Sequence, residues 1–339
     1  MIIVLKQGAT QADAEPILEQ IRSLGLKPLY LPGDEKIVLG ALGDERSLAA
    51  LNLDSIPMVE KVLPILKPYK LANKEFRSDR STVKVGNVVF GGKDAVLIAG
   101  PCSVESEEQI LAAAEGVKRA GAVMLRGGAF KPRTSPYAFQ GLEEEGLKLL
   151  ALAREKTGLP IITEVISEHD IDLVGRYTDM FQIGARNMQN FRLLKAIGET
   201  RIPALLKRGP AASMTELLMA AEYILSSGNP HVVLCERGIK SFFPDTRNTF
   251  DLSIIPLLRQ ETHLPIIADP SHGTGMRSLI PDMSLAALAA GADGLLIEVH
   301  PDPSKALSDG YQQLDLAEFA ALVERIKPLM QALGRGLAA

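Results

Sequence analysis

The sequence is short of several residue types that particular protein classes require. Its 339 residues include no Trp, two Cys, five His and only 5% aromatic residues. Two thiols are too few for a disulfide framework, which favours a reducing compartment. Apolar runs such as 285–292 stop well short of the ~18 residues that span a bilayer, and the apolar start at 1–5 is too short for a secretion signal. We therefore expect a soluble, cytoplasmic protein without a membrane partner.

An excess of charge of one sign is also lacking. Lys and Arg number 37 against 41 Asp and Glu, a formal net charge of −4. This balance excludes a general attraction to nucleic acid, so any anion must be bound by cations gathered locally. The hydrophobic fraction of 46% supports a large core and excludes a disordered chain. The length corresponds to about two domains.

Residues 1–66 predict a small α+β domain. The predicted order is strand 2–6, a helix from Thr10, strands 28–31 and 36–42, a short helix from Asp44, and strand 58–63. This β-α-β-β-α-β order is ferredoxin-like. The segment contains no His, no Cys and no dense polar cluster, so it is either a packing module or a regulatory module.

Residues 67–95 are rich in Lys and Arg. Such a run is more typical of a solvated linker than of a nucleic-acid site. Within it, segments 83–85 and 88–90 flank Gly86-Asn87 and predict a hairpin with a two-residue turn. We expect this hairpin to close the bottom of the domain that follows.

From residue 96 the chain repeats one theme, an apolar β-rich run followed by helix-like sequence. The eight runs are 96–100, 123–127, 160–165, 180–185, 204–209, 231–238, 265–269 and 294–300. Continuously apolar strands that alternate with helices indicate a parallel sheet covered on both faces. Eight such units fit an α/β fold, a (β/α)8 TIM barrel over residues 96–339. A doubly wound sheet is the alternative, but no Gly-rich dinucleotide motif follows any run.

Charged residues stand at nearly every predicted strand end, where the active site of such a barrel lies. Six cations come from adjacent strand ends: Arg126, Lys131, Arg133, Arg186, Lys207 and Arg237. Gathered at one rim, they would repel one another unless anionic groups neutralised them. They predict a ligand with more than one phosphate, or with a phosphate and a carboxylate.

A second group combines a thiol, an imidazole and two carboxylates. Its members follow the first, seventh and eighth strands, and the first and eighth strands are neighbours in a closed barrel: Cys102, His272, Glu298 and Asp309. Mixed S, N and O ligation suits a divalent first-row metal that acts as a Lewis acid. His300 is either a fifth ligand or a partner of a ligand, and Cys235 lies within an apolar run and is expected to pack.

Seven motifs together resemble the 3-deoxy-D-arabino-heptulosonate 7-phosphate (DAHP) synthases. They are Ala99-Gly100-Pro101-Cys102-Ser103, Gly127-Gly128-Ala129-Phe130-Lys131-Pro132-Arg133-Thr134-Ser135, Gln182-Ile183-Gly184-Ala185-Arg186-Asn187, Leu206-Lys207-Arg208-Gly209, Leu234-Cys235-Glu236-Arg237-Gly238, Asp269-Pro270-Ser271-His272 and Glu298-Val299-His300-Pro301. The resemblance covers nearly all of residues 96–315, in the branch that is also similar to the 3-deoxy-D-manno-octulosonate 8-phosphate (KDO8P) synthases. The N-terminal domain resembles the regulatory domain with which some members sense tyrosine or phenylalanine, and such enzymes are commonly homotetramers.

The resemblance implies an enzyme that condenses phosphoenolpyruvate with erythrose 4-phosphate and water, giving DAHP and phosphate at the start of the shikimate pathway. It implies that phosphoenolpyruvate is held by Arg126, Lys131, Ala185, Arg186, Lys207 and Arg237. It implies that erythrose 4-phosphate is received by Lys131, Pro132, Arg133, Thr134 and Ser135. It implies one divalent ion (Mn, Fe, Co, Zn or similar) bound by Cys102, His272, Glu298 and Asp309. In that reaction Lys131 is expected to protonate the new alkoxide, and Glu164 to position the water.

Two alternatives stay open at this point. KDO8P synthase, which uses arabinose 5-phosphate, has a loop that resembles Lys-Ala-Asn-Arg where this chain has Lys131-Pro132-Arg133-Thr134, so the loop favours the four-carbon sugar. A catalytically silent barrel that serves only as an amino-acid sensor is disfavoured by the intact cation and metal sets. The chain departs from the family pattern at Met276, at Pro210 and at Glu143, where Gly is usual.

Overall fold

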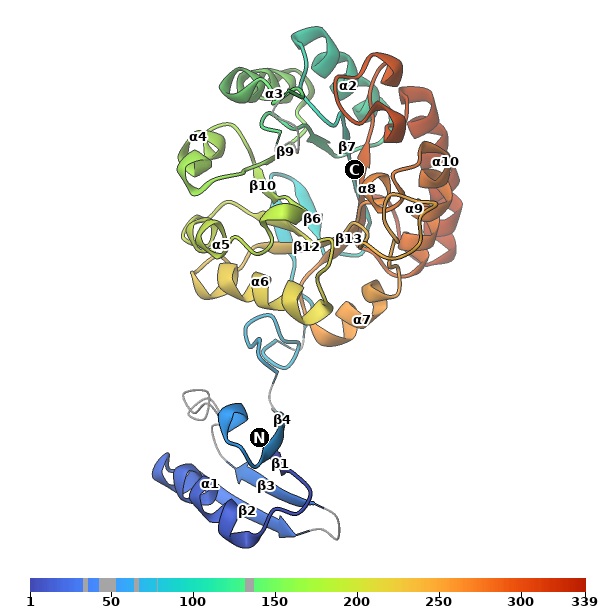
Figure 1. Cartoon of the computed structure of the whole chain (residues 1–339). Helices are drawn as coiled ribbons and strands as arrows, with labels where there is room; N and C mark the ends of the chain where they lie inside the picture. The colour runs from blue at the N-terminus through green and yellow to red at the C-terminus, as the bar shows by residue number, and fades with distance from the viewer. Residues whose placement is uncertain (33–35, 43–52, 64–66, 78, 132–136) are drawn as a thin grey trace. The chain divides into compact units, whose positions relative to one another are not determined.

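The chain folds into two compact units. The computed structural model describes residues 1–32, 36–42, 53–63, 67–77, 79–131 and 137–339. The units are Met1–Pro68 and Tyr69–Ala339 (Figure 1). Within the described ranges, every helix is too short or too polar to cross a bilayer.

The first unit is an antiparallel sheet covered on one face by a helix. In spatial order its strands are β2 (Lys27–Pro32), β3 (Ile37–Leu42), β1 (Ile2–Leu5) and β4 (Val59–Leu63), with α1 (Gln11–Ser23) and a 3-10 turn at Leu53–Ser55. One face of α1, which carries Ile17 and Ile21, packs on Ile3, Leu5 and Leu39 of the sheet. This matches the ferredoxin-like prediction, whereas the short helix expected from Asp44 lies outside the described residues.

The second unit is a closed barrel of parallel strands. In spatial order they are β10 (Met180–Ile183), β11 (Ala204–Lys207), β12 (Val232–Glu236), β13 (Ile266–Ala268), β14 (Gly294–Glu298), β7 (Val96–Gly100), β8 (Met124–Arg126) and β9 (Ile161–Glu164). β14 pairs with β7 along its whole length, from Gly294 beside Val96 to Glu298 beside Gly100, so the eighth predicted strand lies next to the first. The (β/α)8 prediction is confirmed.

Helices surround the barrel because alternate strand residues point outward (Figure 1). They are α2 (Glu107–Ala120), α3 (Glu143–Thr157), α4 (Ile171–Gly175), α5 (Phe191–Gly198), α6 (Met214–Ser226), α7 (Ile254–Glu261), α8 (Pro270–Thr274), α9 (Ile280–Ala289) and α10 (Leu316–Ala332). Short 3-10 turns lie at Glu168–Asp170, Ala185–Asn187, Arg277–Leu279, Pro303–Lys305 and Gly310–Gln312. On β7, Leu97 and Ala99 join the core beneath the helices, whereas Val96 and Ile98 fill the barrel interior.

A hairpin closes the N-terminal end of the barrel. Its strands β5 (Val83–Val85) and β6 (Val88–Phe90) bury Val83, Val85, Val88 and Phe90 in the interior cluster. The hairpin turn approaches the start of β9, since a Cβ on Gly86 would lie 3.1 Å from Pro160. The polar side of the barrel is therefore the opposite, C-terminal end.

Part of the segment expected to be a solvated linker is packed against the barrel. Tyr69 and Ala72 are buried in the main core, and the backbone N–H groups of Leu71 and Ala72 each donate to the Glu222 carboxylate at 2.9 Å. Arg80 makes a two-bond ion pair, at 2.9 and 2.6 Å, with the buried carboxylate of Asp293. The basic composition of this segment therefore did not indicate that Tyr69 and Ala72 are buried or that Arg80 pairs with a buried carboxylate.

Candidate active site

A layer of polar side chains lies directly above the apolar interior of the barrel. Side chains two positions apart on a strand point to the same face of the sheet. The residue two positions after an inward-pointing apolar residue is therefore also expected to point inward. Met124, Ile162, Leu205, Cys235, Ile267 and Leu296 belong to the interior cluster. Two positions further along stand Arg126, Glu164, Lys207, Arg237, Asp269 and Glu298. The barrel thus gathers charges of both signs at the C-terminal ends of its strands.

These residues border a cavity of about 500 Å³ with a strong excess of cations. The cations that line it are Arg126, Lys131, Arg186, Lys207, Arg237, Lys240 and Arg247. Its acidic lining residues are Glu164 and Asp309. Five of the six cations predicted from the sequence lie here, and the sixth, Arg133, falls outside the described residues together with Pro132, Thr134 and Ser135.

Ion pairs connect the predicted phosphate-binding cations to the predicted metal ligands. Arg126 donates to Glu298 at 2.7 Å, and Lys207 donates to Asp269 at 2.5 Å. Asp269 in turn lies 2.7 Å from Nδ1 of His272. The sequence suggested two separate groups, but the structure joins them through buried carboxylates.

The carboxylates in this layer are held in their charged form. Burial alone would raise the pKa of Glu298, but His272, Arg126 and Lys131 bring it down to about 2. Burial likewise opposes ionisation of Asp269, yet His272 and Lys207 hold the pKa of Asp269 well below its usual range. Burial lowers the pKa of the Arg237 guanidinium. A bound anion beside Arg237 would offset that desolvation.

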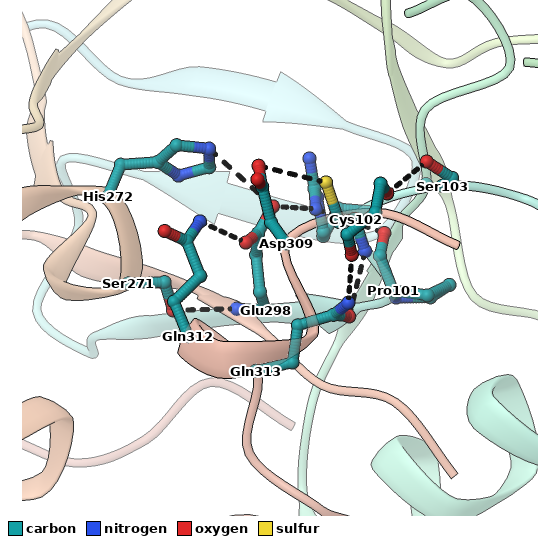
Figure 2. Close-up of polar contacts among 12 residues, drawn as sticks. Pro101, Cys102, Ser103, Ser271, His272, Glu298, Asp309, Gln312 and Gln313 are labelled. Carbon is teal, nitrogen blue, oxygen red and sulfur yellow. Dashed lines mark hydrogen bonds and ion pairs between the residues drawn. The ribbon is translucent and has the colours of Figure 1, made fainter. Parts of the chain in front are cut away.

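The thiol of Cys102 and the carboxylates of Glu298 and Asp309 converge, with potential ligand atoms all within 4.8 Å of one another (Figure 2). The Cys102 sulfur lies 3.6 Å from Asp309 Oδ2, and His272 Nε2 lies 3.5 Å from Glu298 Oε1. Burial, reinforced by Glu298, raises the pKa of the Cys102 thiol. The converging atoms are one sulfur and two oxygens, and the predicted ligand His272 lies outside this group, beside Glu298. A divalent cation would counter the mutual repulsion of these groups, and S and O donors fit such an ion.

Two consecutive glutamines hold the loops that carry these donors. The backbone N–H of Cys102 donates to Gln313 Oε1 at 3.0 Å, and Gln312 donates to Glu298 Oε2 at 2.6 Å (Figure 2). Asp309 adopts a left-handed backbone conformation with φ +45°, which sharpens the turn that brings it to the cluster. Sequence reasoning missed both glutamines, because an amide carries no chemistry that marks it before its partner is known.

His300 holds a loop instead of joining the donor cluster. Its Nδ1 accepts a hydrogen bond from the backbone N–H of Asp302 at 3.0 Å, so the proton lies on Nε2. That nitrogen faces Glu105 at 3.3 Å. Both ring nitrogens are therefore engaged away from the cluster, with partners that are not predicted metal ligands, so these contacts support neither of the two roles that the sequence left open.

Glu164 is positioned by its neighbours on β10. Gln182 donates to Glu164 Oε2 at 3.2 Å. A Cβ on Gly184 would lie 2.0 Å from Glu164 Oε1, so a side chain at this position would displace the carboxylate from its present place. Ala185 and Arg186 follow in a 3-10 turn and line the same cavity.

Lys240 and Arg247 were not identified from the sequence. They lie between β12 and α7, where Lys240 donates to the backbone oxygen of Arg247 at 2.9 Å and Arg247 donates to Gln312 at 2.7 Å. The long stretch without helical periodicity after the sixth predicted strand was the available signal, because long βα loops of a barrel border its active site.

Comparison with known proteins places this geometry in a family. The profile of the DAHP synthetase I family matches residues 71–333, and that of the DAHP synthase ferredoxin-like domain matches residues 1–67. The chain is 48% identical to phospho-2-dehydro-3-deoxyheptonate aldolase of Thermotoga maritima, over 98% of this chain and 99% of that protein. It is 34% identical to 2-dehydro-3-deoxyphosphooctonate aldolase of Syntrophotalea carbinolica, over 69% of this chain and 91% of that protein.

Solved structures agree with this assignment. The crystal structure of the Thermotoga maritima DAHP synthase superposes with a TM-score of 0.96 at 46% identity and covers 99% of both chains. A truncated form of the Thermotoga maritima enzyme has a TM-score of 0.75 at 45% identity and covers 80% of this chain and 99% of its own. The chain therefore belongs to the DAHP synthetase I family and carries a DAHP synthase ferredoxin-like domain at its N-terminus.

Proposed function

We propose that the protein condenses phosphoenolpyruvate with erythrose 4-phosphate and water to give DAHP and phosphate. The observation that carries the proposal is that a cavity lined by seven cations meets the buried Cys102 and Glu298 donors and the partly buried Asp309 at one end of the barrel. Two phosphorylated substrates, one of which has a carboxylate, need such an excess of cations. The similarity to the Thermotoga maritima phospho-2-dehydro-3-deoxyheptonate aldolase supports the same reaction.

Phosphoenolpyruvate is assigned to the part of the cavity near β8, β10, β11 and β12. Its phosphate and carboxylate would be held by Arg126, Lys131, Ala185, Arg186, Lys207 and Arg237, all of which border the cavity. The planar guanidinium groups suit two-bond contacts with these anions, and the lysines act as point charges. Erythrose 4-phosphate is assigned to Lys131 and to Pro132, Arg133, Thr134 and Ser135.

The donor cluster is assigned to one divalent metal ion. Cys102, His272, Glu298 and Asp309 would hold it, and when bound it supplies Lewis-acid polarisation of the aldehyde oxygen of erythrose 4-phosphate. Lys131 lies beside this cluster, with Nζ 3.1 Å from the Cys102 sulfur and 2.9 Å from the Cys102 carbonyl oxygen. It is therefore placed to deliver a proton next to the polarised oxygen.

The bond changes follow from this placement. The C3 carbon of phosphoenolpyruvate attacks the aldehyde carbon, a C–C bond forms, and the aldehyde oxygen takes a proton from Lys131. Water, oriented by Glu164, adds to C2 of the former phosphoenolpyruvate and releases a proton. The C2–O bond to phosphate then breaks, the C2 hydroxyl proton passes to the departing phosphate, which leaves as hydrogen phosphate, and C2 becomes a ketone. Of the two protons of water, one replaces the proton given by Lys131 and the other leaves with phosphate, so the steps balance.

Phosphate release from phosphoenolpyruvate tests the proposal. We expect release only when erythrose 4-phosphate and a divalent ion are both present, loss of release after EDTA, and recovery when Mn²⁺ is added back. A Cys102→Ser variant should keep its fold and require far more Mn²⁺. Full activity in EDTA would contradict the metal assignment, and an absence of release with every component present would contradict the reaction.

The N-terminal unit is assigned to regulation. Its match to the DAHP synthase ferredoxin-like domain, and its folding as a compact unit with its own core, support feedback inhibition by an aromatic amino acid, tyrosine or phenylalanine. We assign the protein to homotetramers on the same basis, and light scattering of the purified protein tests that assembly.

A further inference from the structure

Asp269 stands between the two halves of the proposed site. It follows β13, is 0% exposed, and contacts both Lys207, a predicted phosphoenolpyruvate cation, and His272, a predicted metal ligand. Its Oδ1 accepts the backbone N–H of His272 at 2.9 Å. Its Oδ2 lies 2.5 Å from Lys207 Nζ and 2.7 Å from His272 Nδ1.

We propose that Asp269 is a positioning residue that couples the binding of phosphoenolpyruvate to the binding of the metal ion. The inference rests on the proposed function, because it takes Lys207 as a phosphoenolpyruvate contact and His272 as a metal ligand. The proposed substrate and metal ligands do not include Asp269. The new element is that Lys207, from the substrate site, and His272, from the metal site, compete for the same Asp269 oxygen.

The competition has a defined direction. Oδ2 accepts a hydrogen bond from the Lys207 ammonium, whereas His272 Nδ1 lies 2.7 Å from the same oxygen without a hydrogen bond of its own. An anionic substrate group draws the ammonium toward itself, which leaves Oδ2 to Nδ1 of His272. A carboxylate on the distal nitrogen fixes the orientation of a metal-binding imidazole and raises its basicity. Phosphoenolpyruvate should therefore strengthen metal binding, and by reciprocity the metal should strengthen phosphoenolpyruvate binding.

A second ion pair acts in the same direction. Arg126 donates to Glu298 Oε1, the oxygen that lies 3.5 Å from His272 Nε2. An anion that draws Arg126 away leaves more negative charge on Glu298 for the metal. Each of the two cations thus contacts one buried carboxylate: Arg126 contacts Glu298, and Lys207 contacts Asp269. Glu298 is itself a proposed metal ligand, whereas Asp269 is not. Replacing Asp269 therefore tests the coupling without removing a metal ligand.

The test measures binding, not turnover. Full-length, metal-depleted protein is titrated with Mn²⁺, with and without phosphoenolpyruvate, and free Mn²⁺ is followed by electron paramagnetic resonance. In the native protein we expect phosphoenolpyruvate to raise Mn²⁺ affinity about fivefold or more. In Asp269→Asn we expect Mn²⁺ affinity to fall about 10- to 100-fold and the enhancement by phosphoenolpyruvate to be largely lost.

Two further variants complete the design. Asp179→Asn is the matched control, because Asp179 is an ion-paired carboxylate, 3.0 Å from Arg154, just before β10 at the opposite end of the barrel. It should behave as the native protein. Lys207→Gln breaks the same bridge from the substrate side and should raise Mn²⁺ affinity in the absence of phosphoenolpyruvate, which keeps the inference testable if Asp269→Asn does not fold.

The outcomes separate the inference from the proposed function. Native Mn²⁺ affinity and native enhancement in folded Asp269→Asn, or unchanged Mn²⁺ affinity in Lys207→Gln, would overturn the coupling role while leaving the reaction intact. A purely structural role would lower the stability of Asp269→Asn and leave the enhancement unchanged, which also counts against the inference. Native protein that binds Mn²⁺ but no phosphoenolpyruvate would overturn the proposed function and the inference with it.

Discussion

Glu143 has a backbone conformation that is unfavourable for a residue with a side chain. It begins α3 with φ +50°, a left-handed conformation in which a side chain crowds the following carbonyl oxygen. Its N–H nonetheless donates to the backbone oxygen of Ala129 at 3.0 Å, which fixes the conformation. A Gly at this position would relieve the crowding, so Glu143 costs stability here while leaving every donor of the site in place.

Replacing Glu143 by Gly should therefore stabilise the protein. We expect a gain of about 1 kcal/mol, seen as a higher denaturant midpoint in urea. The neighbouring substitution Glu144→Gly is the control, because Glu144 lies within the first turn of α3 and Gly there should cost about 1 kcal/mol. A lower midpoint for Glu143→Gly would show that its side chain contributes more than its backbone strain costs.

Gly184 tests the placement of Glu164. In Gly184→Ala the new Cβ would stand 2.0 Å from Glu164 Oε1, so the carboxylate must move. We expect kcat to fall about 100-fold, as misplacement by about 1 Å can do, while the fold is retained. Gly92→Ala, whose Cβ would meet only ordinary contacts at 3.7 Å, should leave kcat unchanged. Steady-state kinetics decides, and an active Gly184→Ala would rule out a role for Glu164 at this position.

At the scale of elements, the β5–β6 hairpin is what seals the barrel. Phe90 is 0% exposed and lies in the interior cluster, whereas Val89 beside it points outward with 38% exposure. Strand alternation in a short hairpin thus separates a core residue from a surface residue one position apart. The seal excludes water from the end of the barrel opposite the active site.

Truncating the Phe90 side chain should open a cavity in this seal. We expect Phe90→Ala to lower the free energy of unfolding by about 3–5 kcal/mol, and Val89→Ala by no more than about 0.5 kcal/mol. Chemical denaturation followed by circular dichroism measures both. Equal effects for the two variants would mean that the hairpin is not part of the barrel core.

The elements were more predictable than the contacts between them. Each barrel strand was visible as an apolar run, and six of the eight place a charge two positions after an interior apolar residue, as in Leu205 and Lys207 on β11. The positions of Lys240 and Arg247 at the cavity were not predicted, because their loop has no helical or strand periodicity from which side-chain direction could be inferred. The burial of Tyr69 and Ala72 was not predicted, because single apolar residues within a basic segment form no pattern that indicates a core position. The Lys207–Asp269–His272 bridge likewise joins β11 to β13 through contacts that no local pattern marks.

At the scale of the whole molecule, the proposed site lies within one of the two units. The barrel unit, Tyr69–Ala339, contains the entire cavity and donor cluster, and the unit Met1–Pro68 has its own core around Ile3, Leu5 and Leu39. The formal net charge of −4 conceals the seven cations that line one cavity. The position of the charges, and not their sum, therefore indicates the anionic substrates.

Removing the first unit should separate regulation from catalysis. A chain that begins at Tyr69 is expected to keep condensation activity, because no residue of the proposed site is removed. It should no longer be inhibited by tyrosine or phenylalanine. The full-length protein assayed in parallel is the control, and inhibition that persists after truncation would place the sensor in the barrel.

The most direct test of the central claim compares two acceptors. The protein is supplied with phosphoenolpyruvate and Mn²⁺, together with either erythrose 4-phosphate or arabinose 5-phosphate, and the seven- or eight-carbon product is identified by mass spectrometry along with kcat/KM for each sugar. We predict DAHP as the product and a large preference for erythrose 4-phosphate. A preference for arabinose 5-phosphate, or no condensation with either sugar, would contradict the account.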